Sequence, residues 1–301
     1  MVATVVVGLD GSRESRDAAE WAAREAHLRG LPLRVVHVVE AVPRPWDQAP
    51  LWGGETQADW SERIPRETIE GLRLRHPGVA VSLVRLSGRP AELLPDAASD
   101  AELLVLGSRG MSGVGGFLVG SVGQAVIART EMPVVLVRAG EQAADEHLSD
   151  PVGIPSTATA FRPVTVGVDT ADPADDVIRF ALEEADRRST AVRAVHGWNL
   201  PPYYVYGLSV DLGLREEIVR ERAGELAEVL RPWRQKYPGV EVLEHSRSGS
   251  AAECLVDAAR TSSLVVVGRR IRRGALGPHI GPVTHAVLHH ATAPVVVVAH
   301  P

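Results

Sequence analysis

Short apolar runs alternate along the chain with longer stretches in which small apolar residues recur at helical spacing. Residues 5–7 and 103–106 are two such runs, made only of valine and leucine. Runs without apolar–polar alternation are typical of strands buried on both faces of a parallel sheet. Between them, the alanines at 18, 19, 22, 23 and 26 follow the spacing of one helix face. The pattern predicts an α/β protein.

In the first half of the chain the pattern predicts five strands alternating with four helices. The strands are expected at residues 4–9, 33–39, 79–86, 103–107 and 134–138, and the helices at 13–29, 59–75, 90–99 and 121–129. Strands joined by helices of this length form parallel sheets with right-handed crossovers. We expect a flavodoxin-like or Rossmann-like doubly wound sheet, with ligands at the carboxyl ends of the strands near the switch in strand order.

The second half of the chain repeats the first. Residues 5–10 (VVVGLD) are echoed by residues 164–169 (VTVGVD), 159 positions later. Residues 132–137 (MPVVLV) are echoed by residues 293–298 (APVVVV), 161 positions later. Self-similarity of this kind indicates duplicated structural units. We expect two tandem modules over residues 1–139 and 161–301, joined by a small, polar, Pro-containing linker over residues 140–160.

Composition narrows the classes of protein. The 301 residues carry 32 Lys and Arg against 38 Asp and Glu, and this balance argues against a general nucleic-acid binder or a protein of anionic membranes. No apolar run approaches the roughly 18 residues of a membrane span, and the first residues lack the basic start of a signal peptide. Cys254 is the only cysteine, so we expect a reducing compartment and a cytoplasmic protein.

The segment after the fourth predicted strand carries the strongest functional signal. Residues 107–121 contain six glycines, and glycine at this density favours close approach of the backbone to another group. Such a loop exposes successive N–H groups, and the next helix adds its positive N-terminal end, a combination suited to phosphate. Ser121 falls at the start of that helix, and Arg109 is the only cation in the loop. A surface connection that binds nothing is the alternative.

The spacing Gly107-x2-Gly110-x9-Gly120-Ser121 matches, without a gap, the G-2x-G-9x-G-[ST] signature of the universal stress protein family. The opening VVVGLDGS and the ending MPVVLV of the first module also resemble that family, and the likeness covers both modules. The chain is similar to the tandem-domain members of actinobacteria. The resemblance implies that the first module binds ATP, and it leaves an accompanying Mg²⁺ ion open.

The resemblance also implies roles for individual residues of the first module. Gly8 and Leu9 would line the base pocket, Asp10 would contact the adenosine, and Val39 would offer backbone groups to adenine. The ribose and α-phosphate would be held by Gly107, Arg109 and Gly110, and the β- and γ-phosphates by Gly120, Ser121, Val122 and Gly123. The chain departs from the family at Gly123, where Ser or Thr is usual, so one hydroxyl donor is lost.

The second copy of the glycine loop keeps the spacing and loses two key residues. Ile271 replaces the second signature glycine, and Pro282 replaces the Ser or Thr after the last one. A β-branched side chain resists positive φ, and proline removes an N–H donor. A second nucleotide site is left open, with candidates Asp169, Trp198, Gly268, Arg270, Gly281, Val283 and Thr284. A solvated, arginine-rich loop is the alternative.

Histidines and aromatic residues offer further candidates. His37 and His196 recur near the end of the second strand of each module, where we expect them to bond the backbone. His285 and His289 share one predicted helix face, but a metal site needs a third ligand, so we expect no metal. Aromatic residues follow each second strand, and they either roof a nucleotide pocket, form a partner surface or cover the sheet edge. They are Trp46, Trp52, Trp60, Trp198, Tyr203, Tyr204 and Tyr206.

Three functions remain for the whole chain. The first is a cytoplasmic, ATP-binding stress protein that acts as a nucleotide-responsive regulator. The second is a slow ATPase or phosphotransferase, although the only lysine, Lys236, lies in no P-loop and no catalytic base is evident. The third is an interaction scaffold without nucleotide. The resemblance implies that the apolar last strands, at 134–138 and 295–299, pair within the chain, and it leaves a homodimer open.

Overall fold

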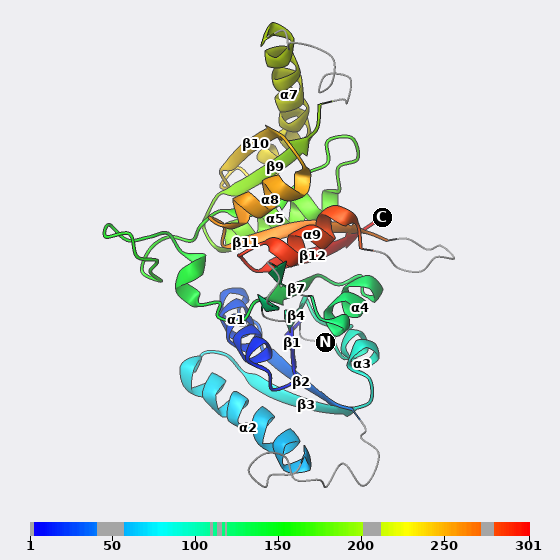
Figure 1. The fold of residues 1–301 in the computed structure, drawn as a ribbon. Helices are drawn as coiled ribbons and strands as arrows, with labels where there is room; N and C mark the ends of the chain where they lie inside the picture. Colours follow the sequence, from blue (N-terminus) through cyan, green and yellow to red (C-terminus); the bar gives the residue numbers. More distant parts are fainter. Residues whose placement is uncertain are drawn as a thin grey trace. The chain divides into compact units, whose positions relative to one another are not determined.

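The computed structural model describes residues 3–40, 57–108, 111–112, 116–117, 119–200, 212–271 and 280–301. The chain divides into two compact units, Met1–Gln142 and Ala143–Pro301. Each unit is a β-sheet with helices on both faces (Figure 1). Most of the segment expected to be a linker therefore belongs to the second unit, where Ala143–Glu146 form a 3-10 helix and Ser149 forms a β-bridge with Pro155.

The first unit contains the elements that the apolar pattern predicts. Its strands are β1 (Val5–Leu9), β2 (Leu33–Val39), β3 (Val81–Ser87), β4 (Leu103–Gly107) and β7 (Val134–Val137). Its helices are α1 (Arg13–Arg29), α2 (Gln57–Arg75), α3 (Pro90–Ala97) and α4 (Ser121–Arg129). A short antiparallel pair, β5 (Met111–Ser112) and β6 (Gly116–Phe117), lies within the glycine-rich segment.

The strand order of the first unit is β7-β4-β1-β2-β3, and each of these pairings is parallel. Numbered along the chain, this is the Rossmann-type order 3-2-1-4-5, and not the flavodoxin-type order 2-1-3-4-5. The order reverses between β1 and β4. The switch point therefore lies at the carboxyl ends of these two strands, directly before Asp10 and Ser108.

The second unit repeats this architecture. Its strands are β8 (Val164–Gly167), β9 (Val192–Trp198), β10 (Val242–Ser248), β11 (Leu264–Arg270) and β12 (Val295–His300). Its helices are α5 (Asp175–Arg187), α7 (Leu212–Lys236), α8 (Ala251–Ala259) and α9 (Pro282–His290). The order β10-β9-β8-β11-β12 with parallel pairing is again 3-2-1-4-5. The predicted pair of tandem α/β modules is confirmed.

Helix α1 shows how the sequence positions the strand ends. Its alanines at 18, 19, 22, 23 and 26 are fully buried, so their small side chains let the helix lie close to the sheet. Ser12 caps the start, its Oγ accepting a hydrogen bond from the Ser15 N–H, and Gly30 ends the helix at φ 64°. These residues fix where β1 stops and the helix begins.

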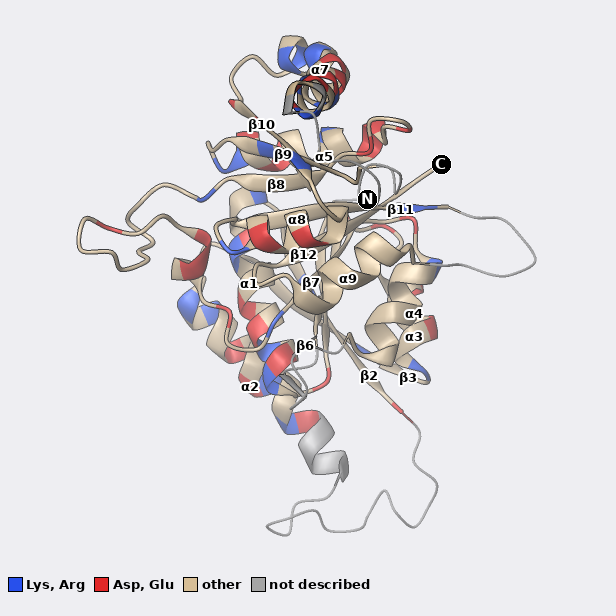
Figure 2. Ribbon diagram, turned by 45° about the horizontal axis from the view of Figure 1, so that its top comes forward, with Lys and Arg blue, Asp and Glu red and all other residues tan. Residues whose placement is uncertain are grey.

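Charged side chains fall into two groups. Along α2 and α7 both signs are interspersed on the outside, as Figure 2 shows. Two ion pairs are instead buried, at matching positions of the two units: Glu25 with Arg29 on α1, at 2.7 Å, and Glu184 of α5 with Arg188, the C-cap of that helix. Within the described residues, no helix is long and apolar enough to cross a membrane.

Candidate functional sites

The first unit has a cavity of about 140 Å³ at the switch point between β1 and β4. The predicted site residues that line it are Gly8, Leu9, Asp10, Gly107, Gly120, Ser121, Val122 and Gly123. The remaining wall includes Val36 and Val38 of β2 and Leu94 of α3. Two predicted residues, Arg109 and Gly110, lie outside the described part of the chain.

Asp10 is fixed in this cavity by the start of α1. Its Oδ1 accepts hydrogen bonds from the Ser12 N–H at 2.9 Å and from the Ser12 hydroxyl at 2.6 Å. Burial raises the pKa of Asp10, but the hydrogen bonds from Ser12 and Ser15 together lower it by more. The pKa of Asp10 is therefore below its ordinary value. The carboxylate is therefore ionised at neutral pH and is an oriented acceptor for hydroxyl or amino groups of a ligand.

Another part of the cavity wall is the beginning of α4. Gly120 is the N-cap and provides no side-chain acceptor, and the first helical bond runs from the Gln124 N–H to the Gly120 carbonyl at 3.0 Å. The N–H groups of Ser121, Val122 and Gly123 therefore have no acceptor within the helix. The helix dipole adds partial positive charge at the same place. This end of the cavity is suited to an anionic group.

Two of the glycines also have a packing role. A Cβ on Gly107 would lie 2.6 Å from the backbone carbonyl carbon of Glu14 in α1, and one on Gly8 would lie 2.7 Å from Cδ2 of Leu106. Sequence reasoning assigned both glycines to the ligand and missed the close approach of Gly107 to α1 and of Gly8 to the side chain of Leu106 in β4. At Gly123, in contrast, a Cβ would make ordinary contacts of 3.5 Å with Leu136 and Val119.

Two predicted site residues do not line the cavities. The Val39 carbonyl accepts a hydrogen bond from the Gly88 N–H at 3.0 Å, so this acceptor is already used within the sheet. Trp198, its counterpart in the second unit, is buried, and its Nε1–H donates to the Ser246 hydroxyl at 3.0 Å. The other aromatic residues singled out after the second strands lie largely outside the described residues.

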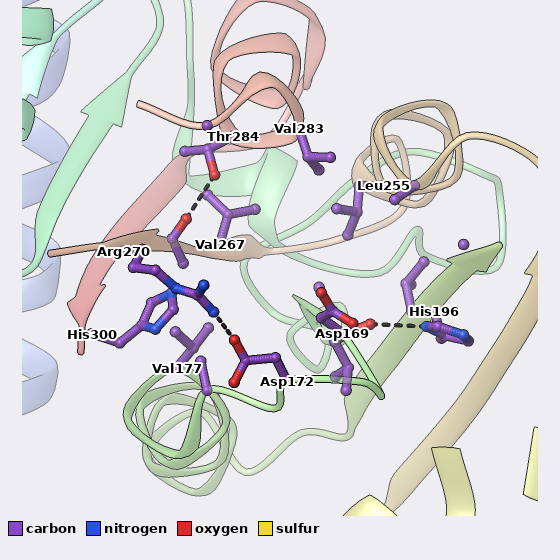
Figure 3. Close-up of a pocket in the computed structure, with 18 of the residues that line it drawn as sticks. Asp169, Asp172, Val177, His196, Leu255, Val267, Arg270, Val283, Thr284 and His300 are labelled. Atoms are coloured by element: carbon purple, nitrogen blue, oxygen red, sulfur yellow. Dashed lines mark hydrogen bonds and ion pairs between the residues drawn. The ribbon is translucent and has the colours of Figure 1, made fainter. Parts of the chain in front are cut away.

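The second unit has a larger cavity of about 390 Å³ at the equivalent switch point (Figure 3). The predicted residues that line it are Asp169, Gly268, Arg270, Gly281, Val283 and Thr284. It also extends towards α5, where the additional lining residues are Asp172, Val177, Ile178 and His300. Within the described part of the first unit, the counterparts of these four residues do not line the smaller cavity.

The late start of α5 explains the extension. Asp172 matches Arg13, the first residue of α1, yet α5 begins only at Asp175. The serines that cap α1 are replaced here by Ala171 and Ala174, and Ala174 is an N-cap without a side-chain hydrogen bond. Because nothing caps the earlier residues, residues 169–174 stay non-helical and leave room between β11 and α5.

Three donors expected beside the glycine loop of the second unit are missing or already used, among the residues that the structure describes. Pro282, at the start of α9, has no N–H. The Thr284 hydroxyl donates to the Gly268 carbonyl at 2.7 Å. The Ile271 N–H donates to the His300 carbonyl at 2.7 Å, which extends the ladder between β11 and β12. Arg270, the last residue of β11, forms an ion pair with Asp172.

The recurrent histidines bond the backbone, as expected. His37 Nδ1 donates to the Leu9 carbonyl at 2.7 Å, and His196 Nδ1 donates to the Val168 carbonyl at 3.1 Å. On α9 the rings of His285 and His289 lie 4.4 Å apart between centroids. Within the part of the chain that the structure describes, no group of three or more His, Cys, Asp or Glu residues is placed to hold a metal ion.

Fold and cavities define a duplicated Rossmann-like protein with a cavity at the switch point of each unit. The model of the universal stress protein family matches residues 1–138 and 160–299, and the chain belongs to this family. The resemblance inferred from the sequence is confirmed.

Relatives match over nearly the whole chain. A universal stress protein of Mycobacterium tuberculosis is 34% identical over 302 residues, covering 97% of this chain and 96% of the relative. One of Mycolicibacterium smegmatis is 31% identical over 306 residues, covering 98% and 96%. The crystal structure of a universal stress protein from Archaeoglobus fulgidus has the same fold, with a TM-score of 0.70, 16% identity and coverage of 99% of this chain and 98% of that one.

Proposed function

We propose that the protein binds ATP in its first unit and acts as a nucleotide-responsive stress regulator. One observation carries the proposal: the same cavity is lined by the ionised Asp10 and by Ser121, Val122 and Gly123, whose N–H groups have no acceptor within α4. A nucleotide has the complementary polarity, with sugar hydroxyls as donors at one end and phosphates as acceptors at the other.

The roles of the residues follow from this polarity. Asp10 accepts hydrogen bonds from the ribose hydroxyls, and the start of α4 receives the terminal phosphates. Leu9, Val36, Val38 and Leu94 supply the apolar wall for the base. For Arg109 and Gly110 the proposal includes the contacts to ribose and α-phosphate that the family resemblance implies. In this proposal ATP acts as a ligand through its binding energy alone. A regulatory response requires a second conformational state of the protein with a different affinity for ATP.

The test compares two substitutions at one position. Ser121→Pro removes an N–H and the hydroxyl, and proline is well tolerated at the first position of a helix. Ser121→Ala removes the hydroxyl alone. Calorimetric titration with ATP and the nucleotide released from denatured, freshly purified protein are measured for both. We expect about one ATP site per chain sensitive to Ser121→Pro, with affinity about tenfold lower or more, and a smaller loss for Ser121→Ala.

Two results would contradict the proposal. Protein that releases no adenine nucleotide and shows no thermal shift in saturating ATP does not bind it, since a ligand of the native state must stabilise that state. Equal affinities for wild type and Ser121→Pro would place the phosphates elsewhere. Pairing of the last strands within the chain and between chains stays a separate proposal, tested by the oligomeric state in solution.

A further inference from the structure

We infer that the cavity of the second unit binds a ligand with one phosphate group, such as a nucleoside monophosphate, and that Arg270 holds this phosphate after parting from Asp172. The inference rests on the proposed function, because it extends nucleotide recognition to the second unit. It differs in where the phosphate goes. In the first unit the phosphates meet the start of α4, whereas in the second unit the phosphate lies on the opposite side of the strand ends, beside α5.

The first step is the loss of the usual phosphate donors beside α9. Three groups that the family signature would aim at phosphates are absent or used: the N–H missing at Pro282, the Thr284 hydroxyl bonded to Gly268, and the Ile271 N–H bonded to His300. The N–H groups of Val283 and Thr284 remain without an acceptor within α9, so a polyphosphate placed there would find fewer donors than at the start of α4. This side of the cavity therefore offers less to a polyphosphate than the first unit does.

The second step is the additional space on the α5 side of the cavity. The late start of α5 opens the cavity towards Val177, Arg270 and His300, and no equivalent space borders the described cavity of the first unit. The His300 imidazole lies against Gly268, where a Cβ would come within 2.9 Å of Nε2. Figure 3 shows Arg270, Asp172 and His300 at one end of the cavity, Leu255 and His196 at the other, and Asp169 between them.

The third step is the state of Arg270. Its side chain is 49% exposed and that of Asp172 is 61% exposed, so their ion pair is solvated and weak. A phosphate offers the guanidinium a bidentate partner with more charge than one carboxylate. Asp172 lies on the uncapped segment 169–174, which can yield without breaking a helix. Exchange of one anion for another at Arg270 therefore costs little.

The fourth step limits the number of phosphates. Asp175 and Asp176 occupy the first turn of α5, and Asp169 and Asp172 line the cavity itself. Among these described carboxylates, Asp176 is paired with Arg179 at 2.5 Å. A triphosphate reaching Arg270 would bring further negative charge against this acidic rim. A monophosphate satisfies Arg270 without that repulsion.

The remaining walls suit a nucleoside. Val195, Leu255, Val267 and Val283 give the cavity an apolar surface for a planar base, and Leu255 lies at the end away from Arg270 (Figure 3). Asp169 occupies the position of Asp10, and its Oδ1 accepts a hydrogen bond from the Ala171 N–H at 3.0 Å. It can accept hydrogen bonds from sugar hydroxyls between the two ends.

The test uses AMP and adenosine, added to the full-length protein already saturated with ATP. Arg270→Ala removes the proposed phosphate partner, and Asp172→Asn removes the competing anion. Matched controls come from the exposed ion pair of Arg247 with Asp257, at 3.0 Å, which does not line the cavity: Arg247→Ala and Asp257→Asn. Calorimetry gives affinity and stoichiometry, and Ser121→Pro reports separately on the first unit.

We expect AMP to bind about tenfold more tightly than adenosine, and Arg270→Ala to abolish this difference. Asp172→Asn should tighten AMP binding at least twofold, while both control variants match the wild type. Equal affinities for AMP and adenosine, or loss of AMP binding because ATP fills both units, would overturn the inference. In either case a single ATP site sensitive to Ser121→Pro leaves the proposed function standing. AMP binding that depends on Arg270, in a protein without any ATP site, would support the inference and contradict the proposed function.

Discussion

The Nδ1 atom of His37 lies 2.7 Å from the carbonyl oxygen of Leu9 and joins the ends of β2 and β1. A carbonyl oxygen can only accept, so Nδ1 carries the proton. This contact sits one residue before Asp10, and the same contact recurs between His196 and Val168 before Asp169. The two histidines therefore hold the strand ends on which both cavities are built.

His37→Leu should lower the free energy of unfolding by about 1–3 kcal/mol, because the buried Leu9 carbonyl loses its donor. It should also weaken ATP binding through displacement of Asp10. Denaturant titration and calorimetry on the same preparation measure both effects. His27→Leu, at an exposed position of α1, is the control and should change neither. An unchanged stability in His37→Leu would mean that the contact at Leu9 carries no weight in the fold.

Gly107→Ala should destabilise the first unit by about 1–3 kcal/mol, since its Cβ would meet the backbone of α1 at 2.6 Å and a backbone cannot yield as a side chain does. Gly224→Ala, in the helix α7, is the opposite case. Nothing lies within 4 Å of its Cβ position, so the variant should be more stable by about 0.5–1 kcal/mol. Thermal unfolding of both variants checks the pair, and equal shifts would refute the packing role of Gly107.

Gly123→Ser should stabilise the protein by roughly 0.5–1 kcal/mol, because glycine within a helix is unfavourable and the space accepts a Cβ. The counterpart Thr284 uses its hydroxyl to bond the Gly268 carbonyl. A serine at 123 should bond Gly107 in the same way and leave ATP affinity within about twofold. Binding that tightens about tenfold or more would instead assign this hydroxyl to a phosphate.

Asp10→Asn should destabilise the protein at neutral pH, and the difference from wild type should fade in acid. The pKa of Asp10 is lowered in the folded protein, so its ionised form favours folding above the ordinary carboxyl pKa. This contribution is lost as the pH falls through the lowered pKa. Denaturant midpoints from roughly pH 6 to pH 3 measure it. A constant difference across that range would exclude ionisation of Asp10 as the cause.

The sequence predicted the framework well because the framework rests on local patterns. Runs of buried valine and leucine marked the strands, and the alanine stripe marked α1 from Arg13 to Arg29, as observed. Duplication then supplied the second unit. The strand order needed the structure, since the Rossmann and flavodoxin orders share the same alternation of elements.

The site was predicted less completely, for two physical reasons. Matching by motif named Val39, for its backbone groups, and did not name Val36 and Val38, which line the cavity. The late start of α5 depends on two missing caps. Their signal was present in the sequence, where Ala171 and Ala174 replace Ser12 and Ser15, but the resulting space and the pairing of Arg270 with Asp172 arise only from tertiary structure.

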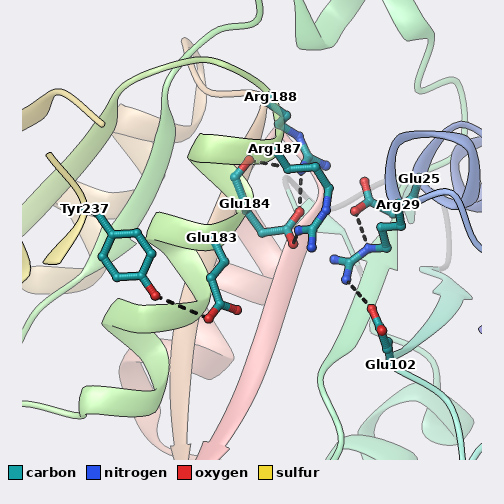
Figure 4. Close-up of polar contacts among 8 residues, drawn as sticks. All are labelled: Glu25, Arg29, Glu102, Glu183, Glu184, Arg187, Arg188 and Tyr237. Carbon is teal, nitrogen blue, oxygen red and sulfur yellow. Dashed lines mark hydrogen bonds and ion pairs between the residues drawn. The ribbon is translucent and has the colours of Figure 1, made fainter. Parts of the chain in front are cut away.

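The buried pairs Glu25–Arg29 and Glu184–Arg188 lie at the C-terminal ends of α1 and α5 (Figure 4). Arg29 also contacts Glu102, the residue before β4, so this pair joins the helix to the amino end of the sheet, away from the cavity. Duplication has kept this end alike while the two serines that cap α1 were exchanged for alanines in the second copy.

A polypeptide whose halves prefer a triphosphate and a monophosphate would sense the ratio of the two compounds, and so the energy state of the cell, and not the abundance of either.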